Sequence, residues 1–109
     1  MSKAAQHRGV FAISVAAEMV AMQIQNLRVY ERRGLVEPDR TSGGSRLYSP
    51  ADIEVLHRIR DLLAEGLNLA GIAKVLELER SVARLRADNA RLRRALEAEP
   101  SRPSPRVSP

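Results

Sequence analysis

The chain has no cysteine, no tryptophan and only three aromatic side chains among 109 residues: Phe11, Tyr30 and Tyr48. Without cysteine, the chain has no disulfides, thiolate metal sites or cysteine nucleophiles, which fits a cytoplasmic protein. Without large aromatics, the core must be built from leucine, isoleucine, valine, alanine and methionine. A chain of this length buries only about 60–65% of its unfolded surface, so we expect one small domain with an appendage.

Long apolar runs are also missing. Crossing a membrane takes roughly 20 apolar residues, and no stretch of the chain approaches that length. Lys3 and Arg8 precede a short apolar run at residues 9–17, an arrangement similar to a secretory signal peptide. Glu18 ends that run, and the pattern beyond it stays amphipathic. We therefore expect a cytoplasmic protein without membrane association.

Catalytic constellations are absent as well. The two histidines, His7 and His57, lack a second histidine at helical spacing. No glycine-rich phosphate loop precedes a helix, and acids such as Glu54 have basic partners one helical turn away. The sequence therefore predicts no enzyme, no metal site and no cofactor.

Positive charge is what the chain has in excess, with 18 basic against 13 acidic side chains and a net charge of +5. All the bases except Lys3 and Lys74 are arginines, which favour forked contacts to phosphate or carboxylate. Residues 1–49 carry the excess and residues 50–79 are acidic. This asymmetry predicts that the first half of the chain meets a polyanion.

Two short helices are expected near the N-terminus, after a disordered arm at residues 1–10. The first starts at Ser14 as N-cap, with Val15, Met19 and Met22 on its buried face. A break at residues 21–23 separates it from the second, which ends at Gly34. This spacing is typical of a helix-turn-helix.

A β-hairpin and two capped helices follow. Gly43 and Gly44 lie between short strand-like arms, which predicts a small wing. Ser49 as N-cap, with Pro50 and Asp52 behind it, starts a helix that runs to Gly66, and Tyr48 is placed to staple that helix. Asn68 caps the next helix.

From residue 78 the apolar spacing alternates between four and three residues, which is typical of a coiled coil. Such a polar helix needs a partner to bury its stripe; we expect a second copy, the alternative being a helix folded back on its own domain. The stripe consists of Leu78, Val82, Leu85, Asn89, Leu92 and Leu96. We expect a dimerisation helix over 78–99 and a disordered Pro/Ser-rich tail over 100–109.

The second short helix has side chains suited to reading DNA bases. Arginine makes forked contacts with guanine, and glutamine and asparagine do so with adenine. Gln25, Asn26 and Arg28 are therefore the candidate base-edge contacts, although Arg28 alone would also suit a solvated helix face. Arg33, Arg40, Arg46 and Tyr48 are candidate phosphate contacts.

Five separated segments resemble the MerR family of transcription regulators, in order and in spacing. They lie within residues 12–78: Ile13–Ala17, Leu27–Val36, Arg46–Tyr48, Asp52–Ile53 and Gly66–Ile72. The resemblance implies a mainly α fold: a winged-helix domain over 11–77, then an antiparallel coiled-coil homodimer on an inverted repeat of double-stranded DNA. The family's DNA contacts carry over to Arg28, Tyr30, Arg46 and Tyr48. With Ser14, Arg33 and Arg40, these complete the candidate interface.

Within that family, residues 13–18, 41–44 and 67–72 are most similar to the heat-shock repressors of actinobacteria. That resemblance implies repression of chaperone genes with the chaperone DnaK as co-repressor. Val29 and residues 23–26 differ from the corresponding helix of these repressors, so we expect a different operator sequence. The short segment after the coiled coil predicts no small-molecule effector domain.

Two other functions fit parts of this pattern. A chaperone-binding adaptor could retain the fold after losing its DNA contacts, but Arg28, Tyr30, Arg46 and Tyr48 are all present. A low-specificity protein coating the nucleoid would bind any sequence equally. A sequence-specific regulator remains the leading prediction.

Overall fold

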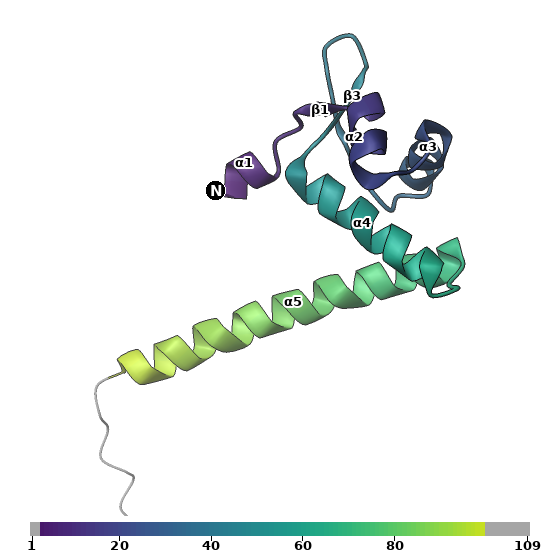
Figure 1. Cartoon of the computed structure of the whole chain (residues 1–109). Coiled ribbons are helices and arrows are strands. Elements are labelled where there is room, and N and C mark those ends of the chain that lie inside the picture. The colour runs from purple at the N-terminus through teal and green to yellow at the C-terminus, as the bar shows by residue number, and fades with distance from the viewer. Residues whose placement is uncertain (1–2, 100–109) are drawn as a thin grey trace, which may run out of the picture. The chain divides into compact units, whose positions relative to one another are not determined.

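The chain divides into two compact units, Met1–Lys74 and Val75–Pro109, of which the computed structural model describes residues 3–99. The fold is mainly α with a small sheet, as the sequence predicts. The expected disordered tail at 100–109 lies outside the described residues. In chain order the elements are α1 (Lys3–Gln6), β1 (Phe11–Ala12), α2 (Ile13–Val20), α3 (Ile24–Arg32), β2 (Asp39–Arg40), β3 (Arg46–Tyr48), α4 (Pro50–Ala64) and α5 (Leu69–Ala98) (Figure 1).

The predicted wing is present as the antiparallel hairpin of β2 and β3. Arg40 pairs with Arg46 across it, and Gly44 takes a φ of +86° in the turn, a conformation that glycine adopts without strain. A third strand, β1, pairs with the other edge of β3, with Phe11 opposite Tyr48. The sequence did not predict this strand.

Residues 3–10 are ordered, so the expectation of a disordered arm is wrong for this stretch. The Val10 amide donates to the Tyr48 carbonyl at 3.0 Å, and the Gly9 amide donates to Asp39 Oδ2 at 3.0 Å. A Cβ on Gly9 would lie 2.5 Å from the Leu47 carbonyl oxygen, so only glycine fits there. These contacts come mainly from the backbone, which leaves no side-chain periodicity to detect.

Helices α2 and α3 pack together as the expected helix-turn-helix (Figure 1). The turn falls at residues 21–23, as predicted, and Gly34 ends α3 in the left-handed region at φ +74°. Ser14 is not the N-cap of α2. The cap position is Ala12, which makes no side-chain capping bond.

The predicted buried face of α2 is wrong. Val15 and Met19 are 43% and 45% exposed, whereas Ala16, Ala17 and Val20 are buried. Helix α2 packs on both α3 and α4. Small side chains let helices approach closely, so the alanines face the core and the longer side chains remain outside.

The helix starts that follow the wing are confirmed. Ser49 Oγ accepts from the Asp52 amide at 3.0 Å and Asp52 Oδ2 accepts from the Ser49 amide at 2.9 Å, which forms a capping box with Pro50 in the first turn. Asn68 Oδ1 accepts from the Gly71 amide at 2.8 Å, as expected of the next cap.

The core of the first unit is aliphatic apart from two tyrosines. Its buried side chains come from α2, α3, the loop after α3, β3, α4 and the start of α5: Ala16, Ala17, Val20, Leu27, Tyr30, Leu35, Val36, Tyr48, Ile53, Leu56, Ile59, Leu62 and Ile72. Arg60 Nη1 also donates to the Val20 carbonyl at 3.1 Å, so α4 provides a partner for the C-terminal end of α2.

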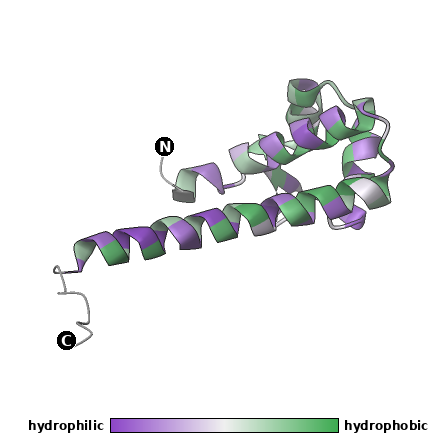
Figure 2. Ribbon diagram, turned by 90° about the horizontal axis from the view of Figure 1, so that it is seen from below, coloured by the Kyte–Doolittle hydropathy of each residue, from purple (hydrophilic) through white to green (hydrophobic). Residues whose placement is uncertain are grey.

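The second unit consists of the continuation of α5, which runs unbroken through Leu78 rather than starting a new helix there. Hydrophobic and hydrophilic residues alternate in short stretches along this helix (Figure 2). Those of the predicted stripe are 43–69% exposed: Leu78, Val82, Leu85, Leu92 and Leu96. Among residues 3–99, no helix has both the length and the apolar character needed to cross a bilayer.

Replacing Ala21 by glycine is expected to raise the free energy of unfolding by about 0.5–1 kcal/mol. Ala21 has φ +54° and ψ +46°, a left-handed conformation that strains its Cβ. Glycine removes that strain, but its greater conformational entropy in the unfolded chain offsets part of the gain in stability. Urea denaturation measures the difference. Ala73→Gly, within α5, is the control and should lower stability by about 1 kcal/mol; equal effects of both changes would contradict the prediction.

Candidate nucleic-acid interface

The candidate base-edge residues share the exposed side of α3. Gln25, Asn26 and Arg28 are exposed, while Leu27 and Tyr30 of the same helix are buried against the core. This separation follows from the amphipathic pattern of the helix. The second helix of the helix-turn-helix therefore presents three side chains that can form paired hydrogen bonds with bases. Arg33, predicted to contact phosphate, is exposed just beyond the end of α3.

The wing arginines are held by an acid that the sequence did not single out, Glu31 of α3. Arg40 Nη2 donates to Glu31 Oε2 at 2.7 Å, and Arg40 Nη1 donates to the Gly44 carbonyl at 2.9 Å. Arg46 Nε donates to the other carboxylate oxygen of Glu31. One carboxylate thus ties both predicted phosphate contacts of the wing to the predicted recognition helix.

The charge state of Glu31 fits this role. Burial works to raise the pKa of this carboxyl, but the hydrogen bond from Arg46 and the charges of Arg46 and Arg40 outweigh it, so its pKa lies below the ordinary value of 4.5. Glu31 is therefore ionised at neutral pH and cancels part of the wing's positive charge.

The two tyrosines predicted to contact phosphate belong to the core instead. Tyr48 is completely buried and Tyr30 is 4% exposed. Burial raises the pKa of both phenols. The Tyr48 hydroxyl is buried without a hydrogen-bond partner in the part of the chain that the structure describes. The alternative role of Tyr48, packing beside the start of α4, agrees with its burial.

Ser14 is exposed in the first turn of α2. The backbone N–H groups in the first turn of a helix have no intrahelical partner, and such groups suit a phosphate. Within residues 3–99, no cluster of three or more histidine, aspartate or glutamate side chains could hold a metal ion.

A family model described as the MerR HTH family regulatory protein matches residues 11–79, more than half of the chain. The chain belongs to the MerR family. The family model describes a regulatory protein and relatives such as GlnR are HTH-type transcriptional regulators, which agrees with the prediction of a regulator rather than an enzyme.

The curated relatives include a heat shock protein and an HTH-type transcriptional regulator. The chain is 51% identical to the heat shock protein HspR of Streptomyces coelicolor over 81% of this chain and 59% of that protein. It is 42% identical to the HTH-type transcriptional regulator GlnR of Bacillus cereus over 62% of this chain and 52% of that protein. The chain thus spans between half and two thirds of the length of these MerR relatives.

Solved structures of MerR regulators have the same fold. The lead-bound regulator PbrR691 of Ralstonia metallidurans superposes with a TM-score of 0.59 at 26% identity, covering 87% of this chain and 92% of that one. HiNmlR, a MerR regulator lacking the sensor domain and bound to promoter DNA, gives a TM-score of 0.58 at 22% identity, over 80% and 78% of the two chains. These matches confirm the predicted winged-helix fold.

Tyr48→Phe is expected to raise the free energy of unfolding by about 1 kcal/mol and to leave DNA affinity unchanged. A buried hydroxyl without a partner costs about 1–3 kcal/mol, and phenylalanine keeps the packing of the ring. Thermal denaturation and a DNA titration measure the two quantities. A variant of normal stability that binds DNA more weakly would restore the phosphate role predicted from the sequence.

Proposed function

We propose that the protein is a homodimeric, sequence-specific repressor of heat-shock or chaperone genes that binds an inverted-repeat operator. The observation that supports this most is the 51% identity to HspR over 89 residues, which is 81% of this chain. The exposed polar face of α3 supplies the chemistry that reading an operator requires.

In this proposal the exposed side chains divide into two groups. Gln25, Asn26 and Arg28 read base edges in the major groove, where each base pair presents a distinct pattern of donors and acceptors. Phosphates are contacted by Ser14, Arg33, Arg40 and Arg46. Phosphate contacts fix the position and orientation of the domain, and the base contacts supply the sequence preference.

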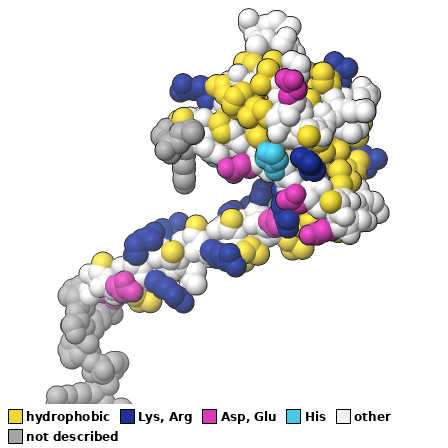
Figure 3. All heavy atoms as spheres, in the orientation of Figure 1, with side chains coloured by type: hydrophobic (Ala, Val, Ile, Leu, Met, Phe, Trp, Pro, Cys, Tyr) yellow, Lys and Arg dark blue, Asp and Glu magenta, His cyan; other side chains and the backbone are white. Residues whose placement is uncertain are grey.

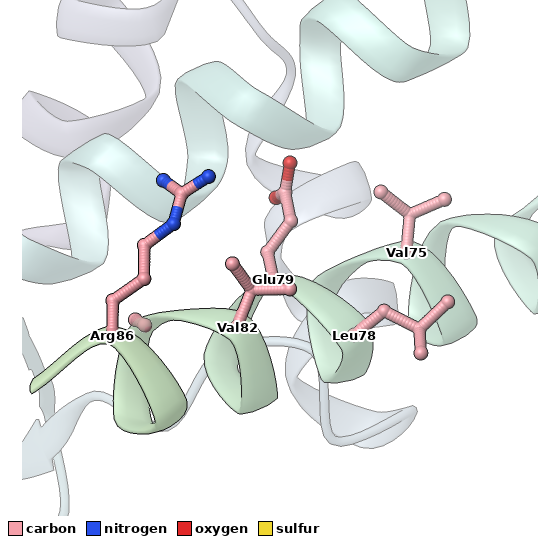
Figure 4. A pocket seen from close by; sticks show the side chains of 6 residues that line it. Val75, Leu78, Glu79, Val82 and Arg86 are labelled. Carbon is pink, nitrogen blue, oxygen red and sulfur yellow. The ribbon is translucent and has the colours of Figure 1, made fainter. Parts of the chain in front are cut away.

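The second copy would pack against the apolar stripe of α5. Val75, Leu78 and Val82 line a shallow groove on this helix, with Glu79 and Arg86 beside them (Figure 4). A second groove follows along the same face, lined in part by Leu85, Asn89 and Leu92. Five large apolar side chains exposed on one helix support a helical partner.

Repression and a DnaK co-repressor rest on the relationship to HspR alone. The chain spans 59% of the length of HspR, and we propose repression as its activity with DnaK as the co-repressor. We propose the nucleoid as the site of action, since the proposed target is DNA. No small-molecule effector enters this proposal.

DNase footprinting and fluorescence anisotropy on the promoter of the protein's own gene test the proposal. At about 150 mM salt, the protein should protect an inverted repeat and bind it about 1,000-fold or more tightly than random DNA. Equal affinity for both would instead indicate a low-specificity nucleoid protein. No binding to either would indicate the chaperone-binding adaptor, which a titration with purified DnaK then tests directly.

A further inference from the structure

Glu31 provides the side-chain hydrogen bonds that join α3 to the wing within the described residues. It is also the sole acid of α3, a helix whose other charged residues are Arg28 and Arg32. An acid here opposes the attraction of DNA phosphates, so its position calls for a physical explanation.

The wing is too short to hold its own position. Strand β2 has two residues and β3 has three, and residues 41–45 between them are all exposed. Isolated hairpins are marginally stable even when longer. Pairing with β1 supports one edge of β3. The arginine pair across the hairpin, Arg40 of β2 and Arg46 of β3, is held by Glu31.

The geometry leaves Arg46 able to serve two partners at once. Its Nε bonds to Glu31, while the two terminal nitrogens of its guanidinium have no partner among the described residues. A guanidinium has five N–H donors in a rigid fork, so anchoring through Nε fixes the direction of the other four. Arg40, by contrast, uses both terminal nitrogens, one on Glu31 and one on the Gly44 carbonyl.

The contact is partly shielded from water, which makes it stronger than an ordinary surface pair. The side chain of Glu31 is 17% exposed and that of Arg46 is 23% exposed, against 48% for Arg40. Exposed ion pairs contribute little because water and salt screen them. The Glu31–Arg46 pair is therefore the rigid part of the arrangement, and Arg40 closes it from the solvent side.

We infer that Glu31 is a positioning residue that sets DNA specificity. It fixes the wing arginines at one distance from the reading face of α3, the exposed face that carries Gln25, Asn26 and Arg28. It also lowers the attraction of these arginines for DNA of any sequence. Phosphates at an operator lie at the correct distance from the bases that α3 reads. On random DNA, two arginines that are partly neutralised by Glu31 gain less binding free energy from phosphates than two arginines without a carboxylate partner would gain. This inference rests on the proposed function, since it requires an operator.

Glu31→Gln tests the inference because it removes the charge and keeps the shape of the side chain. Affinity for random DNA should rise about fivefold at 150 mM salt, and the salt slope on random DNA should steepen by about 1, since one more charge neutralises phosphate. Affinity for the operator should fall about tenfold as the wing loses its position. The ratio of operator to random affinity should therefore fall by roughly 50-fold.

Glu37→Gln is the matched control. Glu37 is an exposed acid five residues after the end of α3 and forms no ion pair with the wing arginines, so its loss changes the net charge equally without touching the wing. It should leave the ratio of operator to random affinity within about twofold. If Glu31→Gln and Glu37→Gln change this ratio equally, charge alone is responsible and the inference fails.

Glu31→Asp separates position from charge. The shorter side chain keeps the charge but draws the carboxylate away from both arginines, so operator affinity should fall while affinity for random DNA stays at the wild-type value. Melting curves identify any variant that fails to fold. Parallel losses on both DNAs in a folded variant would overturn the inference.

Amide hydrogen exchange in DNA-free protein tests the positioning step without an operator. Glu31→Gln should speed exchange at residues 40–46 about tenfold or more and leave α4 unchanged, and the control should change neither. Unchanged exchange in the wing contradicts the inference even if the operator is found. Faster exchange in a protein that binds no inverted repeat contradicts the proposed function and retains the positioning role.

Discussion

Replacing Leu85 and Leu92 together by lysine is expected to turn the protein into monomers and to weaken operator binding about 100-fold or more. Both side chains are well exposed on the stripe of α5, where a second copy would bury them. Two charges per copy would then face an apolar surface, and burying charge without a partner is strongly unfavourable. Loss of the dimer also removes the gain from binding two half-sites through one molecule.

Light scattering gives the mass of the assembly, and anisotropy on the operator gives the affinity. Ala87→Lys with Ala98→Lys is the matched control, because it adds the same charge to the same helix away from the stripe. The control should remain dimeric. Asn89→Leu should strengthen the dimer, since a polar residue in such a stripe costs stability. A double lysine variant that is still dimeric refutes the assignment of α5 as the interface.

The surface of α5 suggests that burial of the apolar stripe, and not attraction between charges, stabilises the dimer. Basic side chains are spread along the helix with apolar ones between them (Figure 3). Residues 80–99 hold twice as many bases as acids, so two such helices repel each other at long range. Burial of the apolar side chains must overcome that repulsion, and added salt should therefore favour the dimer.

Local features of the fold were predictable because neighbouring residues determine them. The capping box at Ser49 and Asp52, the glycine that ends α3 and the turn of the wing each depend on a few adjacent side chains. Apolar periodicity located α4 and α5 for the same reason. These features need no knowledge of which elements meet in space.

The errors concern contacts between distant segments. The buried face of α2 is defined by Ala16 and Ala17, whose small size matters only because other helices approach closely there. Strand β1 depends on backbone bonds to β3, and in the pairing of Phe11 with Tyr48 the two residues lie 37 positions apart in the chain. Neither interaction changes the local hydrophobic pattern.

The candidate site shows the same division. Exposure of Gln25, Asn26 and Arg28 follows from helix periodicity and agrees with the structure. The role of Glu31 depends on its distance to Arg40 and Arg46, residues that belong to another element. A single acid within a basic recognition helix was the available indication, and it does not identify the partners.

Arg28→Ala is expected to cost about 1–3 kcal/mol of operator binding and to relax the preference for one base pair in each half-site. Arg28 is exposed on the reading face of α3 and has no ion pair there in the described chain, so its forked donors are available to a guanine. Binding to operators with each base pair substituted in turn measures the loss. Arg28→Lys is the sharper variant, because it keeps the charge and loses the fork.

Arg46→Ala should behave differently, since its guanidinium lies in the wing and is oriented by Glu31. It should weaken binding to all operator variants by a similar factor, whichever base pair is substituted, and reduce the salt slope by about 1, as expected when one phosphate contact is lost. Arg28→Lys should leave the salt slope unchanged while flattening the preference at its base pair. If Arg28→Lys keeps that preference, or if Arg46→Ala changes the preference at a single base pair, the division between a reading helix and a positioning wing is wrong.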